Sequence, residues 1–182
     1  MYPKAIQQVF NVHGKTSCMK TGIIALCLCA FFFILPLQCY IIGNDMGVGV
    51  QGAVFRYQMS SMGNSLIPIT KELGYVASGT YEGRTAFSIL FWAIGTTILS
   101  LITLLSLIYG NRLTPRHIRI ITVGLGSSGL CYFISCFFQY GMFLSGPAGI
   151  SLPIGVILML LFALGFHFYK DFFFIEDSVP GT

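Results

Sequence analysis

Four long apolar stretches dominate the chain, and one long polar interval separates the first from the second. The stretches cover about residues 21–42, 85–109, 116–143 and 152–170. Each approaches or exceeds the roughly 20 residues that a helix needs to cross the hydrocarbon core of a bilayer. The pattern predicts an all-α membrane protein, a four-transmembrane-helix bundle of tetraspan type. The four helices and their loops form one domain over residues 21–171, and residues 1–20 and 172–182 are terminal tails.

The polar interval, residues 43–84, is predicted to be a small, partly β loop between helices one and two. Phe55, Tyr57 and Met59 alternate with polar or β-branched neighbours, which is the two-residue period of a strand. Burial of these apolar side chains against the helix ends would make the loop a compact cap without disulfides. Arg56 falls on the opposite strand face, where it would stay solvated or form an exposed ion pair with Glu72 or Glu82. We expect Phe55, Arg56, Tyr57 and Met59 to form the interaction surface of this loop.

The composition excludes several classes of protein. Only 9% of residues are charged and 55% are hydrophobic, whereas soluble domains carry about 25% charged residues. The bilayer is therefore the expected solvent and first partner. The formal net charge is +4, and no run of Lys and Arg alternates with aromatic residues, so nucleic acid is not an expected partner.

The distribution of basic residues predicts the orientation in the membrane. With the N-terminus inside, the loop side holds three basic residues, and the other side holds seven: Lys4, Lys15, Lys20, Arg112, Arg116, Arg119 and Lys170. Both termini are therefore expected in the cytoplasm and the long loop outside, in the cytoplasmic (plasma) membrane. A signal peptide is the competing interpretation of residues 21–42, but the long apolar run lacks a small-residue cleavage site.

Small residues repeat along the apolar stretches at spacings that favour helix packing. A packing seam is the preferred interpretation and a permeation path the alternative. The seam residues are Gly22, Cys29, Gly95, Ser106, Gly124, Ser128, Cys131 and Ser135.

Candidate chemistry is sparse. His117 and His167 fall at the same predicted interface and are weak candidates for a cofactor site, although metal sites need more ligands at defined spacing. No nucleophile–base pair is visible, so no enzyme activity and no cofactor is predicted. Deep ionisable groups are absent from the apolar stretches, which argues against a proton-coupled transporter. Cys39 and Cys136 both fall in outer helix halves, and a bridge between them is left open.

Four helices, cytoplasmic ends and a strand-containing first outer loop resemble the architecture of claudin-like tetraspan proteins. The resemblance covers the whole chain but is one of architecture. The claudin signature of a tryptophan and two cysteines in the first outer loop is absent, and Trp92 falls in the second apolar stretch instead. The resemblance therefore assigns no residue roles.

These patterns lead to one functional prediction and two alternatives. We expect a non-enzymatic integral membrane subunit or scaffold that binds other membrane or envelope proteins, or further copies of itself, through its outer loop and helix faces. One alternative is a cofactor-bearing or lipid-active protein that uses His117 and His167. The other is a small channel lined by backbone and hydroxyl groups.

Overall fold

A computed structural model of the protein describes residues 26, 29–43, 47–61, 63–109, 114–146 and 149–169. The predicted tails, residues 1–20 and 172–182, lie outside this part of the chain.

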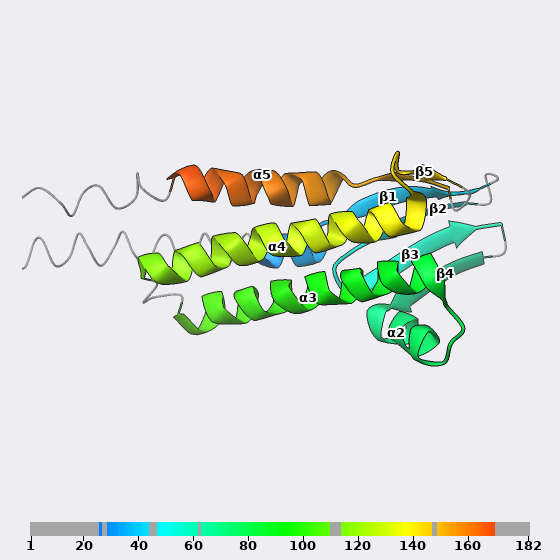
Figure 1. The fold of residues 1–182 in the computed structure, drawn as a ribbon, viewed down its shortest axis with the longest axis horizontal. Coiled ribbons are helices and arrows are strands. Elements are labelled where there is room, and N and C mark those ends of the chain that lie inside the picture. Colours follow the sequence, from blue (N-terminus) through cyan, green and yellow to red (C-terminus); the bar gives the residue numbers. More distant parts are fainter. Residues whose placement is uncertain are drawn as a thin grey trace, which may run out of the picture.

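The described part combines helices with a six-stranded antiparallel sheet (Figure 1). After a helical stretch over residues 29–34, the chain forms strands β1 (Gln38–Ile42), β2 (Gly47–Gln51), β3 (Phe55–Ser60) and β4 (Gly63–Pro68). Helices α2 (Ile69–Ala77), α3 (Gly83–Tyr109) and α4 (Pro115–Tyr140) follow. Strands β5 (Ser145–Gly146) and β6 (Gly149–Leu152) then precede helix α5 (Ile154–Tyr169). The strand order is β4-β3-β2-β1-β6-β5.

The predicted all-α bundle of four transmembrane helices is wrong. The first apolar stretch does not stay helical to residue 42, because Pro36 lacks the backbone N–H that continues a helix and the last helical bond of this stretch runs from Leu35 N to Phe31 O. The chain then enters β1, which pairs with β2 on one side and β6 on the other. Residues 149–152, at the edge of the fourth predicted helix, form strand β6, which pairs with β1.

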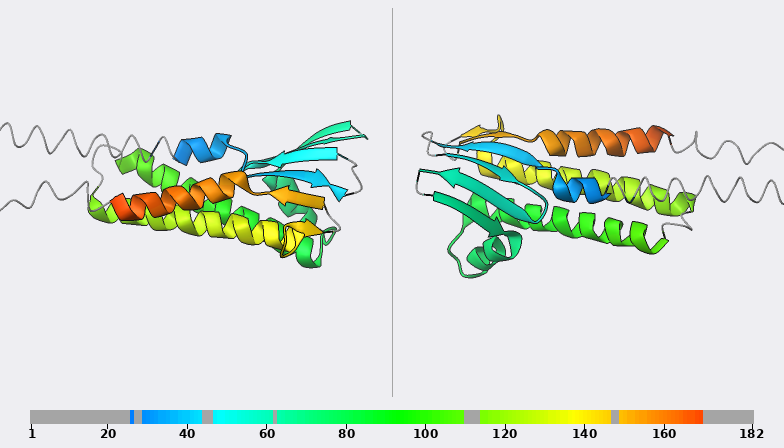
Figure 2. Two further views of the ribbon diagram at one scale, coloured as in Figure 1. Left: turned by 90° about the horizontal axis from the view of Figure 1, so that it is seen from above. Right: turned by 180° about the vertical axis from the view of Figure 1, so that it is seen from behind.

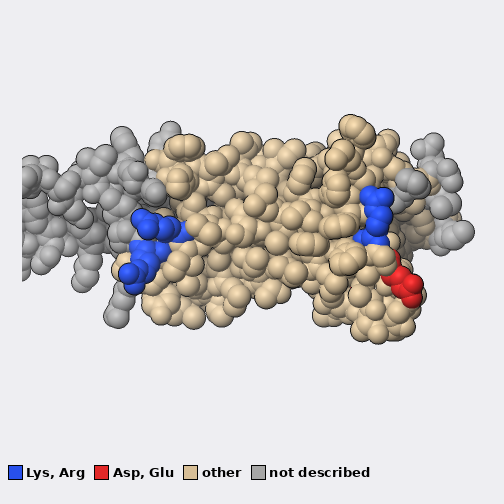
Figure 3. Space-filling model, viewed as in Figure 1, with Lys and Arg blue, Asp and Glu red and all other residues tan. Residues whose placement is uncertain are grey.

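Two of the described helices, α3 and α4, are long and apolar enough to cross a membrane. They comprise 27 and 26 residues, and α5, with 16 residues, is shorter than a full span. Thr114 caps the start of α4, with Pro115 at its first position. Figure 3 shows Lys and Arg near both ends of the visible face and an uncharged belt between them.

Helices α3, α4 and α5 lie roughly along one axis, and the sheet lies at the end where α3 begins and α4 ends (Figures 1 and 2). The hydrophobic core runs from the helices into the base of the sheet and includes the fully buried side chains of Phe32, Trp92, Leu125, Tyr132 and Met159. One face of the sheet packs on the first half of α3 and on the end of α4. The side chains on this face of the sheet therefore determine which groups contact the two helices.

Candidate functional site

The two faces of the sheet have opposite chemistry, and the polar face is the buried one. Along β1, Gln38 and Tyr40 are buried, whereas Ile41 is 44% exposed. Along β6, Ser151 is buried between the exposed Ile150 and Leu152. An antiparallel sheet with one face in water normally turns its apolar side chains inward. This sheet is inverted, with polar side chains against the helices and apolar side chains on the outward face.

Arg56 is the centre of the inward polar face. It is 6% exposed and reaches three different elements. Its Nη2 donates to Gln51 Oε1 at 2.9 Å and to Gln139 Oε1 on α4 at 3.1 Å, and its Nη1 lies 3.2 Å from Glu72 Oε1 on α2. The guanidinium also lies 5.3 Å from the ring centre of Trp92, within range of a cation–π interaction. One buried charge thus connects β3 to β2, α2, α3 and α4.

Glu72 supplies the counter-charge and is 1% exposed. Its Oε2 has no hydrogen-bond partner among the described residues. A buried ion pair needs such hydrogen bonds to offset the loss of hydration. The Arg56–Glu72 pair is therefore better explained as fixing α2 against the sheet than as a large net source of stability.

Gln38 extends the polar network toward α4 and β6. Its amide nitrogen donates to Gln51 Oε1 at 2.7 Å. Its carbonyl oxygen accepts from Cys136 Sγ at 2.7 Å and from Ser151 Oγ at 2.9 Å. Burial is the main influence on the neighbouring Tyr40 hydroxyl and raises its pKa, while the charge of Arg56 acts in the opposite direction. The hydrogen bonds of Gln38 thus connect β1 to β2, α4 and β6.

Trp92 fixes the base of the sheet. Its indole N–H donates to the backbone carbonyls of Gly52 at 3.1 Å and Ala53 at 2.9 Å. Thr96, one turn further along α3, also donates to the Ala53 carbonyl. These bonds satisfy the backbone between β2 and β3, which would otherwise be left without partners in an apolar environment.

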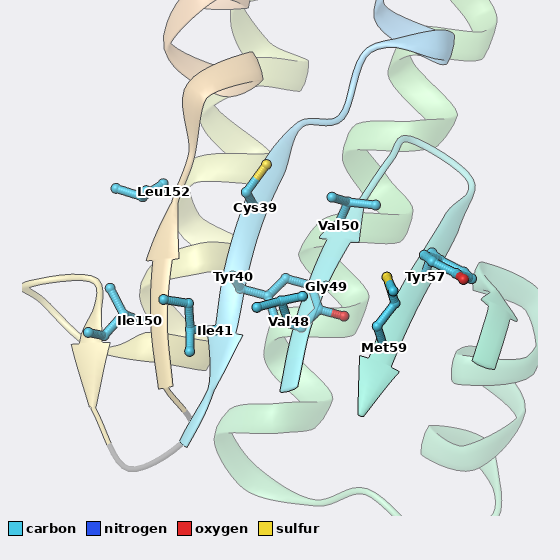
Figure 4. A pocket seen from close by; sticks show the side chains of 10 residues that line it. All are labelled: Cys39, Tyr40, Ile41, Val48, Gly49, Val50, Tyr57, Met59, Ile150 and Leu152. Carbon is cyan, nitrogen blue, oxygen red and sulfur yellow. The ribbon is translucent and has the colours of Figure 1, made fainter. Parts of the chain in front are cut away.

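The outward face carries an apolar groove of about 240 Å³ (Figure 4). Alternate residues of β1, β2, β3 and β6 form it, and no charged side chain lines it: Cys39, Ile41, Val48, Val50, Tyr57, Met59, Ile150 and Leu152. Gly49 completes the floor of the groove. A side chain at this position would overlap the ring of Tyr40 beneath it. The groove has the chemistry of a hydrocarbon site.

The edges of the sheet differ in length. Among the described strands, β4 pairs with β3 alone and leaves its other side open over six residues, whereas β5 at the opposite edge has two residues. β4 carries no charged residue, and five of its six residues are exposed. Open strands of this kind are templates for pairing with another chain.

The predicted loop residues divide between the two faces. Phe55 and Tyr57 are half-buried and Met59 is 48% exposed on the outward side. Arg56 forms one of the two expected ion pairs, with Glu72, but the pair is buried, so the expectation of an exposed pair is wrong. The sequence showed Arg56 on the opposite strand face, but not that helices cover that face.

Most of the predicted seam residues lie between helices. Ser135 and Ser88 donate to each other's backbone carbonyls, and Ser128 Oγ donates to the Gly95 carbonyl at 2.8 Å. Gly124 faces Ile102. Cys29 and Ser106 are buried, Cys131 is half-buried, and Gly22 lies outside the described residues.

Each of the two described histidines contacts an aromatic ring. His117 closes a capping box with Thr114 and stacks on Tyr109, and the exposed His167 contacts Phe168. The described residues contain no group of three or more His, Cys, Asp or Glu that could hold a metal ion. Cys39 and Cys136 are both free thiols. Cys39 lies on the outward face of β1, whereas Cys136, on α4, contacts Gln38 on the inward face.

Sequence reasoning missed Gln51 and the central role of Gln139 and Gln38 in the network. A signal was present for Gln38 and Gln139, because they are the strongest polar side chains within the apolar stretches. Gln51 had none, since glutamine in a polar interval is ordinary. No protein-family model and no curated protein matches this chain.

Proposed function

We propose that this protein is a non-enzymatic integral membrane subunit or scaffold that binds another membrane protein through the open edge of its sheet. In this proposal α3 and α4 cross the plasma membrane. The α3–α4 connection is cytoplasmic, and the sheet is on the outer side. Arg116 and Arg119 at the start of α4 agree with this orientation.

The open edge of β4 is the observation that carries the proposal. Unpaired backbone N–H and C=O groups are costly wherever water is scarce. The sheet lies beside two helices that are long enough to cross a membrane. A strand from a second protein would satisfy these groups, as in recognition by strand addition. The buried network of Arg56 supports this role, because it holds the edge in a fixed position before a partner arrives.

Purification from the native membrane in mild detergent tests the proposal. We expect a complex, whose second protein mass spectrometry would identify. A monodisperse 20.0 kDa monomer without a co-purifying protein would contradict the proposal.

Two adjacent variants, Asn64→Pro and Ser65→Pro, sharpen the test. Successive residues of a strand direct their N–H groups to opposite sides, so one variant removes a bond to β3 and the other a donor at the open edge. The edge variant should lose the bound protein while unfolding like wild type. Retention of the bound protein by both variants would exclude β4 as the binding edge.

A further inference from the structure

The apolar groove differs from the open edge in its backbone chemistry. Its floor is formed by β1 and β2, and each of these strands is paired on both sides. A peptide lying there would find no backbone partners for its own N–H and C=O groups, at a cost for each one desolvated. A hydrocarbon chain has no such groups. The groove therefore favours an aliphatic ligand over a polypeptide.

The helices fix the depth of this groove in a membrane. The charge-free part of α4, residues 120–140, is about 31 Å long at 1.5 Å per residue, which matches the roughly 30 Å hydrocarbon core. Ser88 contacts Ser135 near the end of that part, so Arg84 on α3 marks the adjacent boundary. Trp92 and Thr96, which bind the Ala53 carbonyl, lie roughly 12 and 18 Å inside Arg84 along the helix.

The sheet therefore begins within one leaflet. A five-residue strand such as β1 extends roughly 17 Å, enough to run from the depth of Ala53 to the membrane surface. The outward face is also continuous with apolar helix surfaces at its base. Ile34, just before β1, is 81% exposed, and Ile154 and Ile157 at the start of α5 are exposed as well.

We propose that this groove is a binding site for one acyl chain of a membrane lipid. The proposal rests on the proposed crossing of the membrane by α3 and α4. The chain lies along β1 and β2 between Ile41, Val48 and Met59, with its methyl end toward Ala53 and its head group at the open ends of the strands. The lipid then covers the apolar face of the sheet, which explains why apolar side chains face outward there.

Photo-crosslinking tests this site on the full chain. The protein is reconstituted into phosphatidylcholine vesicles in which a small fraction of the lipid carries a diazirine on one acyl chain. We expect peptide mapping to find crosslinks on the outward residues Ile41, Val48 and Met59 and none on the inward residues Gln38 and Gln51. Val48→Trp, which fills the groove, should reduce this labelling several-fold, and Ile157→Trp on α5 is the matched control and should leave it unchanged.

Three results overturn the proposal in distinguishable ways. Labelling of α5 at Ile157 without labelling of β1 and β2 shows that no acyl chain enters the groove. Labelling of β1 and β2 that appears only at low protein density in the vesicles shows that a second copy occupies the groove at higher density. Absence of labelling anywhere on α3 and α4 shows that the helices do not enter the bilayer, which contradicts the proposed function itself. The wild-type map decides these cases even if Val48→Trp does not fold.

Discussion

Arg56 Nη1 and Glu72 Oε1 lie 3.2 Å apart, with their side chains 8% and 1% exposed. This pair joins β3 to α2 under the cover of the sheet and the helices. It fixes α2 against the sheet within a segment of about 40 residues that would be marginal by itself.

Removing one charge of this pair should be strongly destabilising. Glu72→Gln leaves the Arg56 guanidinium buried without a counter-ion, and such changes cost about 3–5 kcal/mol. Denaturant unfolding in detergent micelles measures the loss, with the emission of Trp92, the single tryptophan of the chain, as the signal. The matched control is Glu82→Gln at an exposed position, where we expect a change within about 0.5 kcal/mol.

Removing both charges should cost less than the two single changes together. The double variant Arg56→Met, Glu72→Leu leaves no unpaired charge, so its unfolding free energy should exceed that of Glu72→Gln. If Glu72→Gln unfolds like wild type, the ion pair is not buried in the folded protein and this account of the network is wrong.

Gly49 should tolerate no side chain. Its added methyl group would overlap the ring of Tyr40, and overpacking of this kind costs about 1–3 kcal/mol. We expect Gly49→Ala to lower the unfolding free energy by that amount. Gly74→Ala is the control, because open space surrounds that position in α2 and alanine there should stabilise the protein by about 0.4–1 kcal/mol. Equal effects of the two variants would contradict the close contact of Gly49 with Tyr40.

The contact between α3 and α4 depends on Gly95. A side chain there would meet the Tyr132 ring at 3.1 Å and the Ser128 carbonyl oxygen at 3.2 Å. Gly95→Val should therefore push the helices apart, which spin labels at Leu101 and Val123, two exposed positions on the pair, would detect as a longer distance. Ser128→Ala removes one hydrogen bond and should cost only about 0.6 kcal/mol. An unchanged distance in Gly95→Val would contradict this packing.

Cys39 and Cys136 should resist oxidation to a disulfide. Cys39 lines the outward groove, whereas the Cys136 thiol donates to Gln38 on the inward side. A variant that keeps only these two cysteines should give no intramolecular bridge under a mild oxidant, as measured by peptide mass spectrometry. A high yield of the bridge would place both thiols on one face and contradict the register of β1.

The sequence alone indicated several local features correctly. The apolar runs of α3 and α4 are long enough to cross a membrane by length and composition, which are properties of the chain itself. The alternation through Phe55, Tyr57 and Met59 coincides with β3, because a two-residue period separates the faces of any strand. The start of α4 at Thr114 and Pro115 has a local cause in the sequence, since a helix cap acts within one turn.

The sequence alone could not assign residues 38–42 and 149–152, which form β1 and β6. Residues 39–42 are apolar and fit a buried strand as well as a helix end. The choice depends on β2 and β6, and β6 lies more than 100 residues further along the chain. Hydropathy contains no information on such distant pairing.

The buried site was decided by tertiary structure. Arg56 looked solvated because a charge in a polar interval normally is. Its burial requires Gln51, Glu72 and Gln139 together, and Gln139 is 83 positions away. The sequence determined which face of β3 carries Arg56. Only the packing of that face on α3 and α4 decided that the polar side would be inside and the apolar side outside, because a strand's alternation separates two faces without specifying what each will meet.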